Sequence, residues 1–177
     1  TQTGGIDILI NNAGIVVGKY FHEHTHEQIS KSMLVNSSAL MHIAAEFLPG
    51  MMERNSGAVC NIASSAGLIS NPKMSVYAAS KWAAVGWSDS LRLEMEQLKK
   101  NISVTTIMPF YISTGMFDGV RSKLLPILEP EKTSERIIKA IENDTKMLAM
   151  PLPYWFIRFS QGILPLPVFD WVMRNVF

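Results

Sequence analysis

Tyr77 and Lys81 stand four positions apart, and this spacing is the first chemical signal in the chain. On a helix, residues at i and i+4 leave the same face one turn apart, so a phenol and an ammonium group would lie together. A free tyrosine has a pKa of about 10 and exchanges protons poorly at neutral pH. A neighbouring ammonium group stabilises the phenolate and lowers that pKa, which would make the pair an acid/base centre. The alternative is a packed aromatic side chain beside a solvated lysine.

Two further polar residues favour the acid/base interpretation. Ser64 follows an apolar run and stands 13 positions before Tyr77. A hydroxyl at the end of a strand can bind a substrate carbonyl oxygen while the phenol delivers the proton. Asn36 lies inside a long predicted helix, where asparagine is mildly unfavourable. Asn36 is therefore either a solvated polar residue or the mark of a local break that holds water.

Short apolar runs alternate with long amphipathic segments along the chain, and this alternation predicts an α/β fold. Each apolar run is bounded by small or turn-forming residues, as buried strands are. The predicted strands cover 6–10, 57–62, 102–108 and, more briefly, 146–150. The predicted helices cover 25–54, 75–99 and 130–143.

Local signals set the predicted ends of these helices. Thr25 and Gln28 have the spacing of a capping box at the start of the first helix. Pro49 and the glycine after it predict a kink or break near the end of that helix. Asn101 is the expected stop of the second helix, and Pro130 opens the third.

Open parallel sheets bind ligands at the carboxyl ends of their strands. The segments that follow the three main strands are 11–14, 64–67 and 109–114. We therefore expect these segments to line one crevice, which Tyr77 and Lys81 must reach from the second long helix.

Composition limits the classes of function. The 177 residues suffice for one domain, and 47% hydrophobic residues suffice for a core. A formal net charge of +1 argues against a general nucleic-acid binder, which needs a basic surplus. The single cysteine, Cys60, excludes an internal disulfide framework and a multi-cysteine zinc site, and it fits a reducing, cytoplasmic compartment. His22, His24 and His26 alternate at a predicted loop-to-helix junction, where we expect helix capping and no metal.

The two ends of the chain carry different signals. The first residues have no basic and apolar segments of a secretion signal, and no uncharged apolar run reaches the ~18 residues of a membrane span. Residues 151–177 are apolar but broken by several prolines, so we expect no single continuous helix there. This extension is expected to pack on or near a substrate pocket, with contact to a membrane surface as the alternative.

Taken together, these residues resemble the short-chain dehydrogenase/reductase family. The match in type and spacing comprises Asn11-Asn12-Ala13-Gly14, Asn36, Ser64, Tyr77 with Lys81, and Pro109 with Thr114. The similarity runs from Asp7 to Met150, and segments 109–115 and 128–131 look like the retinol and hydroxysteroid dehydrogenase branch. The resemblance implies a Rossmann-like, doubly wound parallel sheet, with residues 1–150 as the C-terminal part of that domain.

The resemblance also implies a role for each matching residue. Tyr77 would be the acid/base and Ser64 would polarise the substrate oxygen. Lys81 would hold the nicotinamide ribose and lower the pKa of Tyr77, helped by the cationic nicotinamide ring. Asn36 would hold a water of a proton relay. The implied cofactor-binding residues are Asn11, Ala13, Gly14, Tyr77, Lys81, Pro109, Ile112 and Thr114. Ser65 stands one residue too close to Tyr77 for the family serine.

The implied activity is that of an alcohol dehydrogenase or carbonyl reductase. The complete protein would transfer a hydride between NAD or NADP and an apolar alcohol or carbonyl substrate, as a homo-oligomer (a dimer or tetramer). Two alternatives stay open at this point. One is a non-redox reaction on the same scaffold, such as epimerisation or dehydration. The other is a non-catalytic binding or interaction protein.

Two departures from the family pattern stand out. Phe110 takes the place of a glycine after the proline that ends the third strand. No G-x-G-x-x-G loop occurs in the 177 residues, so the chain is expected to lack about 75 residues of the dinucleotide-binding half, including the part that selects NAD or NADP. Without the first strands, a sheet edge and apolar faces would be exposed. The 177 residues alone are therefore expected to aggregate, to bind cofactor weakly and to be inactive.

Overall fold

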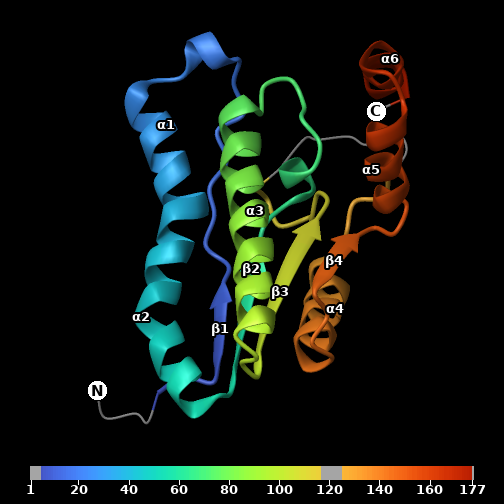
Figure 1. Ribbon diagram of the computed structural model, residues 1–177. Helices are drawn as coiled ribbons and strands as arrows, with labels where there is room; N and C mark the ends of the chain where they lie inside the picture. The colour runs from blue at the N-terminus through green and yellow to red at the C-terminus, as the bar shows by residue number, and fades with distance from the viewer. Residues whose placement is uncertain (1–4, 117–124, 177) are drawn as a thin grey trace.

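The computed structural model describes residues 5–116 and 125–176, in which strands alternate with helices (Figure 1). The strands are β1 (Ile8–Asn11), β2 (Gly57–Ile62), β3 (Ile102–Pro109) and β4 (Met147–Met150). The α-helices are α1 (His26–Met33), α2 (Ala39–Arg54), α3 (Ser75–Gln97), α4 (Pro130–Glu142), α5 (Tyr154–Ile163) and α6 (Leu166–Val176). Three short helical segments complete the list: η1 (Phe21–Glu23), η2 (Leu34–Ser38) and η3 (Ser65–Gly67).

The four strands form one parallel sheet in the order β1-β2-β3-β4. In the register, Cys60 of β2 lies between Ile10 of β1 and Thr105 of β3. Parallel neighbours need a crossover connection, and the long helical segments supply it. The predicted α/β fold with a parallel sheet is confirmed, and all four strands lie where the apolar runs predicted them.

Helices cover both faces of this sheet. Successive residues of a strand point to opposite faces, so Val59 and Cys60 mark the two sides. Val59 packs in a cluster with residues of α2 and α3, which lie side by side along the sheet in Figure 1. Cys60 packs instead with Ala140 and Ile141 of α4. On β1, however, the side chains of Ile8 and Ile10 are about half exposed, at 54% and 50%.

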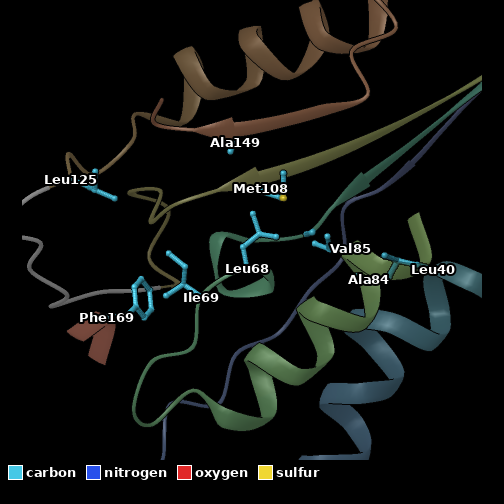
Figure 2. Close-up of a cluster of buried hydrophobic side chains, with 10 residues drawn as sticks. Leu40, Leu68, Ile69, Ala84, Val85, Met108, Leu125, Ala149 and Phe169 are labelled. Carbon is cyan, nitrogen blue, oxygen red and sulfur yellow. The ribbon is translucent and has the colours of Figure 1, made fainter. Parts of the chain in front are cut away.

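A third cluster of buried apolar side chains joins the C-terminal helices to the body of the protein (Figure 2). Phe169 of α6 packs in it with Ile69 and Leu125. Leu164 and Pro165 separate α5 from α6, so the expectation that residues 151–177 do not form one helix is confirmed. None of the helices in the described ranges is long and apolar enough to cross a membrane.

The first long helical segment has its irregularity at Asn36 and not at Pro49. Residues Leu34–Ser38 form a π-helical turn, whereas α2 continues through Pro49 to Arg54. A break at Pro49 is therefore wrong, whereas a kink there, the other outcome that an interior proline allows, stays a prediction. The capping box is confirmed: Thr25 Oγ1 accepts from the Gln28 amide, and Gln28 Oε1 accepts from the Thr25 amide, both at 3.2 Å.

The end of α3 also differs from the prediction. Lys99, with φ +51°, takes the left-handed conformation, and the helix ends at Gln97. Asn101 does not act as the stop because its amide donates to Asn55 Oδ1 at 2.9 Å, which ties it to the end of α2.

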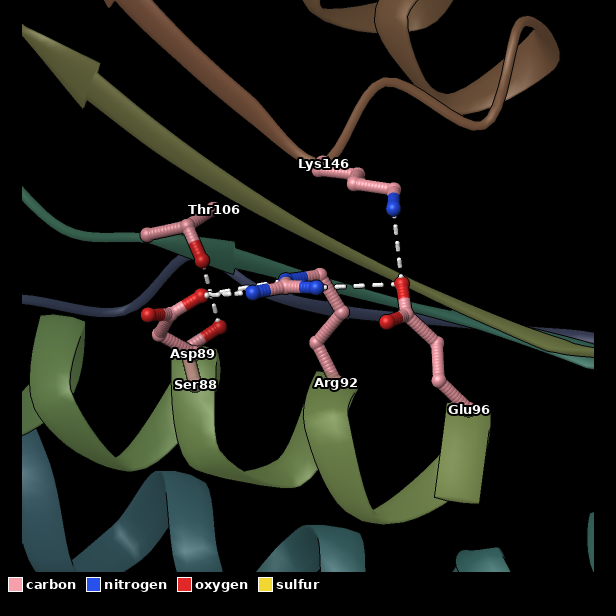
Figure 3. Close-up of polar contacts among 6 residues, drawn as sticks. All are labelled: Ser88, Asp89, Arg92, Glu96, Thr106 and Lys146. Carbon is pink, nitrogen blue, oxygen red and sulfur yellow. Dashed lines mark hydrogen bonds and ion pairs between the residues drawn. The ribbon is translucent and has the colours of Figure 1, made fainter. Parts of the chain in front are cut away.

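Buried polar bonds fix α3 against three strands. Asn11 Nδ2 donates to Asn61 Oδ1 at 2.8 Å, and Asn61 Nδ2 donates to Ser88 Oγ at 2.9 Å. Ser88 also hydrogen-bonds to Thr106 Oγ1 at 2.7 Å (Figure 3). Further along α3, ion pairs join Arg92 to Asp89 and Glu96, and Lys146 to Glu96. Buried hydrogen bonds have strict geometry, so this network sets how far along the sheet α3 lies.

Candidate active site

Ser64 and Tyr77 meet at the carboxyl end of β2. Ser64 follows the strand in an extended conformation and caps η3, with its Oγ accepting from the Ala66 amide at 3.1 Å. Tyr77 lies in the first turn of α3, and its side chain lies beside that of Ser64 at the wall of a cavity that both residues line. Both side chains are buried. The sequence prediction that the two hydroxyls face each other at the sheet edge therefore agrees with the structure.

Lys81 lies one helical turn beyond Tyr77 and is only 3% exposed. Its Nζ donates to the main-chain oxygen of Ile62 at 2.9 Å and lies 5.8 Å from the centre of the Tyr77 ring. Burial lowers the pKa of Lys81 from 10.5 to about 8, because desolvation penalises the charged form. A cation is thus held inside the protein beside the phenol.

The pKa of Tyr77 moves in the opposite direction to the one expected. Burial raises it above its ordinary value, the hydrogen bond with Ser64 lowers it, and the nearby Tyr111 raises it. In the protein alone, Tyr77 is therefore a proton donor at neutral pH.

Asn36 uses its side chain to hold the segment that follows β1. Its Oδ1 accepts from the Ile15 amide at 2.8 Å, and its Nδ2 donates to the Ile15 carbonyl at 2.9 Å and to Ser80 Oγ at 3.0 Å. The polar atoms of this fully buried side chain are occupied by protein partners. The expected water would therefore have to be held by another atom of this residue.

A cavity of about 450 Å³ opens at this end of the sheet. It contains seven of the eight residues expected to bind a cofactor: Ala13, Gly14, Tyr77, Lys81, Pro109, Ile112 and Thr114. Asn11 is the exception, because its buried side chain bonds to Asn61 and braces β1 against β2. Asn12 lines the cavity in its place. Asn12 belongs to the motif that signalled the site, and cofactor binding by Asn11 stays a prediction.

A smaller chamber adjoins this cavity. It shares Ser64, Tyr77 and Phe110 with the large cavity and is otherwise lined by Ser65, Ala66, Asn71, Met74 and Tyr111. The hydroxyls of Ser64 and Tyr77 thus stand between a cavity that contains Lys81 and a chamber that does not. The ring of Phe110, which replaces the family glycine, packs against Tyr111 with centroids 4.5 Å apart. Phe110 therefore forms part of the wall between them and leaves Thr114 in the large cavity.

Comparison with known proteins identifies the family. Residues 1–125 match the model of the short chain dehydrogenases. The chain belongs to this family. It is 43% identical over 169 residues to epidermal retinol dehydrogenase 2 of Mus musculus, a match that covers 93% of this chain and 55% of that protein. The similarity to the retinol dehydrogenase branch, first indicated by two short segments, is thereby confirmed.

Solved structures agree with the family fold. A 4-hydroxyisoleucine dehydrogenase complexed with NADH has a TM-score of 0.71 and 27% identity, with 81% of this chain and 66% of that chain covered. A short-chain dehydrogenase of Streptomyces avermitilis has a TM-score of 0.78 and 24% identity, with coverages of 98% and 72%, and shows the fold. The chain spans about half the length of the curated relatives it matches.

The described residues fit the nicotinamide and ribose part of a dinucleotide. A Cβ at Gly14 would lie 3.5 Å from both Lys81 Nζ and Asn36 Oδ1, so glycine keeps the space in front of the lysine open. The ammonium group and the phenol are donors suited to ribose hydroxyls. Thr114 and the main chain of Ile112 line the same cavity and can contact a carboxamide.

Proposed function

We propose that the complete protein is an NAD(P)-dependent oxidoreductase that interconverts an apolar alcohol and its carbonyl compound. The observation that carries this proposal is that Ser64 and Tyr77 line one cavity, in which Lys81 lies one helical turn beyond the tyrosine. A phenol and a serine hydroxyl that meet in this way can both contact one substrate oxygen. Membership of the short-chain dehydrogenases supports the proposal.

In this mechanism, the two hydroxyls act on the substrate oxygen. During reduction, Ser64 donates a hydrogen bond to the carbonyl oxygen while Tyr77 delivers a proton to it; during oxidation, Tyr77 takes the proton back. The buried Lys81 supplies a positive charge beside the phenol and a donor for the ribose. A nicotinamide, when bound, supplies or accepts the hydride. Asn36 positions the loop after β1 that lines the cavity.

The substrate is proposed to be a fat-soluble alcohol or aldehyde. The cavity that contains Ser64 and Tyr77 has, besides its few polar groups, the apolar side chains of Ile62, Ala63, Phe110 and Met116. An apolar wall with few polar groups selects an apolar substrate with one reacting oxygen. The name of the relative from Mus musculus makes retinol the first substrate to test.

We also propose a membrane contact through the C-terminal helices and a homo-oligomer through the outer face of α2 and α3. Phe169 anchors the C-terminal helices, residues 151–176, beside Ile69, and Ile69 is close in sequence to the chamber residue Asn71. The exposed apolar side chains of these helices suit a membrane surface. Apolar side chains are also exposed on α2 and α3, which suits a homo-oligomer.

Substitution of the tyrosine tests the activity. In the natural full-length protein, Tyr77→Phe should lower kcat/KM for retinol and retinal by about a hundredfold or more, because the proton donor is lost. Tyr20→Phe, at an exposed tyrosine outside both cavities, is the matched control and should leave turnover unchanged. Unchanged turnover in Tyr77→Phe would remove this residue from the mechanism.

Product analysis separates the proposal from its alternatives. A net redox reaction consumes the dinucleotide in proportion to product, and a deuteride from labelled cofactor appears in the alcohol. An epimerase or dehydratase would form product without net cofactor consumption. A binding protein would retain the cofactor and the ligand without turning either over.

A further inference from the structure

We propose that Ser80 is a positioning residue that sets the distance between Lys81 and the glycine wall of the cavity. Ser80 is fully buried on α3, one residue before Lys81, and lines neither cavity. Its influence passes through Asn36 and the main chain of Ile15.

The Ser80 hydroxyl makes two bonds with opposite roles. Its Oγ donates to the main-chain oxygen of Tyr77 at 2.7 Å and accepts from Asn36 Nδ2 at 3.0 Å. A hydroxyl has only one proton, so donation to Tyr77 leaves the oxygen as an acceptor toward Asn36. An alanine could fill neither role.

This polarity selects one orientation of the Asn36 amide. With the NH₂ group toward Ser80, Nδ2 also donates to the Ile15 carbonyl at 2.9 Å, and Oδ1 is left to accept from the Ile15 amide at 2.8 Å. The reversed amide would place two donors together at Ile15 and two acceptors together at its carbonyl. Ser80 adds a third bond to the same amide and so reinforces the orientation that holds both main-chain groups of Ile15.

The clamp on Ile15 fixes the adjacent Gly14, which lines the large cavity. A Cβ built on Gly14 would lie 3.5 Å from both Asn36 Oδ1 and Lys81 Nζ. The glycine, the amide and the ammonium group therefore share one small region. Because Ser80 precedes Lys81 on the same helix and also bonds to Asn36, it ties the two sides of this region together.

Hydrogen exchange in the natural full-length protein tests this without ligand or turnover. Ser80→Ala should accelerate exchange of the Ile15 amide by about tenfold, the factor that corresponds to one lost hydrogen bond. Ser88→Ala is the matched control, since Ser88 is equally buried on the same helix and bonds to Asn61 and Thr106, not to Asn36. This variant should leave exchange at Ile15 unchanged.

Conservative variants guard against loss of folding. Ser80→Thr keeps the hydroxyl and should restore slow exchange at Ile15. Ser80→Cys is close in shape but a weak donor and acceptor, so it should give an intermediate rate. Unchanged exchange at Ile15 in the alanine and cysteine variants, or equal acceleration by Ser88→Ala, would overturn the proposal.

A kinetic measurement of the same variants rests on the proposed oxidoreductase function. Ser80→Ala should raise KM for the dinucleotide several-fold, with a smaller effect on kcat, because the wall moves while Tyr77 and Ser64 remain. Equal KM values for the Ser80→Ala and Ser88→Ala variants would contradict this expectation. The exchange measurement needs no turnover. It therefore tests the role of Ser80 even if the protein is not an oxidoreductase, and the failure of either proposal can be told from the failure of the other.

Discussion

Lys81 Nζ donates to the main-chain oxygen of Ile62 at 2.9 Å, which anchors a buried cation at the carboxyl end of β2. One neutral carbonyl compensates a desolvated ammonium group only in part, and burial accordingly lowers the pKa of Lys81 to about 8. The charge is therefore held at the site at the expense of folding stability. The free energy of unfolding should therefore change with pH as Lys81 titrates.

The free energy of unfolding should rise with pH between about 8 and 10.5 because of Lys81. In that window the unfolded chain binds the proton and the folded protein does not, so raising the pH favours folding. The full contribution is on the order of 3 kcal/mol. Urea unfolding of wild type and Lys81→Met at several pH values separates the contribution of Lys81 from that of other groups. The free energy of unfolding of wild type relative to the variant should increase with pH. A pH-independent difference would contradict the prediction.

Tyr77 should titrate above its ordinary pKa of 10.0 in the protein without ligand, because burial raises the pKa. Oxidised dinucleotide should lower this pKa, since the positive nicotinamide ring favours the phenolate. Tyrosine labelled with ¹³C at Cζ reports both titrations by NMR, and Tyr77→Phe assigns the resonance. A midpoint below 10 without ligand, or one that oxidised dinucleotide leaves unmoved, would show that another group controls the phenol.

The sequence predicted the site well where it depends on strand ends and helix spacing. Ser64 follows β2, and Tyr77 and Lys81 follow the helical repeat of α3, so local patterns and parallel topology sufficed. Asn36 was singled out because asparagine is unusual in a helix, and the π-turn lies there. These signals are local, and one chain suffices to detect them.

What the sequence did not predict depends on contacts between distant residues. Ser80 lies inside the motif that contains Tyr77 and Lys81, yet its bond to Asn36 spans 44 positions. The direction of the Tyr77 pKa depends on how deeply the folded chain buries the phenol, which spacing alone does not give. In the same way, the bond of Asn101 to Asn55 displaced the expected helix stop.

The outer face of α2 and α3 should mediate a homo-oligomer. Ile43 and Phe47 are one turn apart on α2, and Trp82 and Leu93 are three turns apart on α3, and all four are exposed. Trp82→Glu should shift the protein to a smaller species in sedimentation velocity, because a charge opposes burial of this face. Phe21→Glu alters another exposed aromatic residue, on η1, and should leave the sedimentation unchanged. Identical sedimentation of Trp82→Glu and wild type would exclude this face.

The C-terminal helices should contact a lipid surface through α5. Phe156, Phe159 and Ile163 follow a helical repeat and are 73%, 64% and 62% exposed, so they form an apolar stripe that the described residues leave uncovered. Phe156→Glu combined with Phe159→Glu should reduce flotation with phosphatidylcholine vesicles by about tenfold or more, since two aromatic side chains no longer leave water. Leu98→Glu, which changes an exposed apolar residue at the end of α3, should float as wild type does. Equal flotation of wild type and both variants would contradict a lipid contact of this stripe.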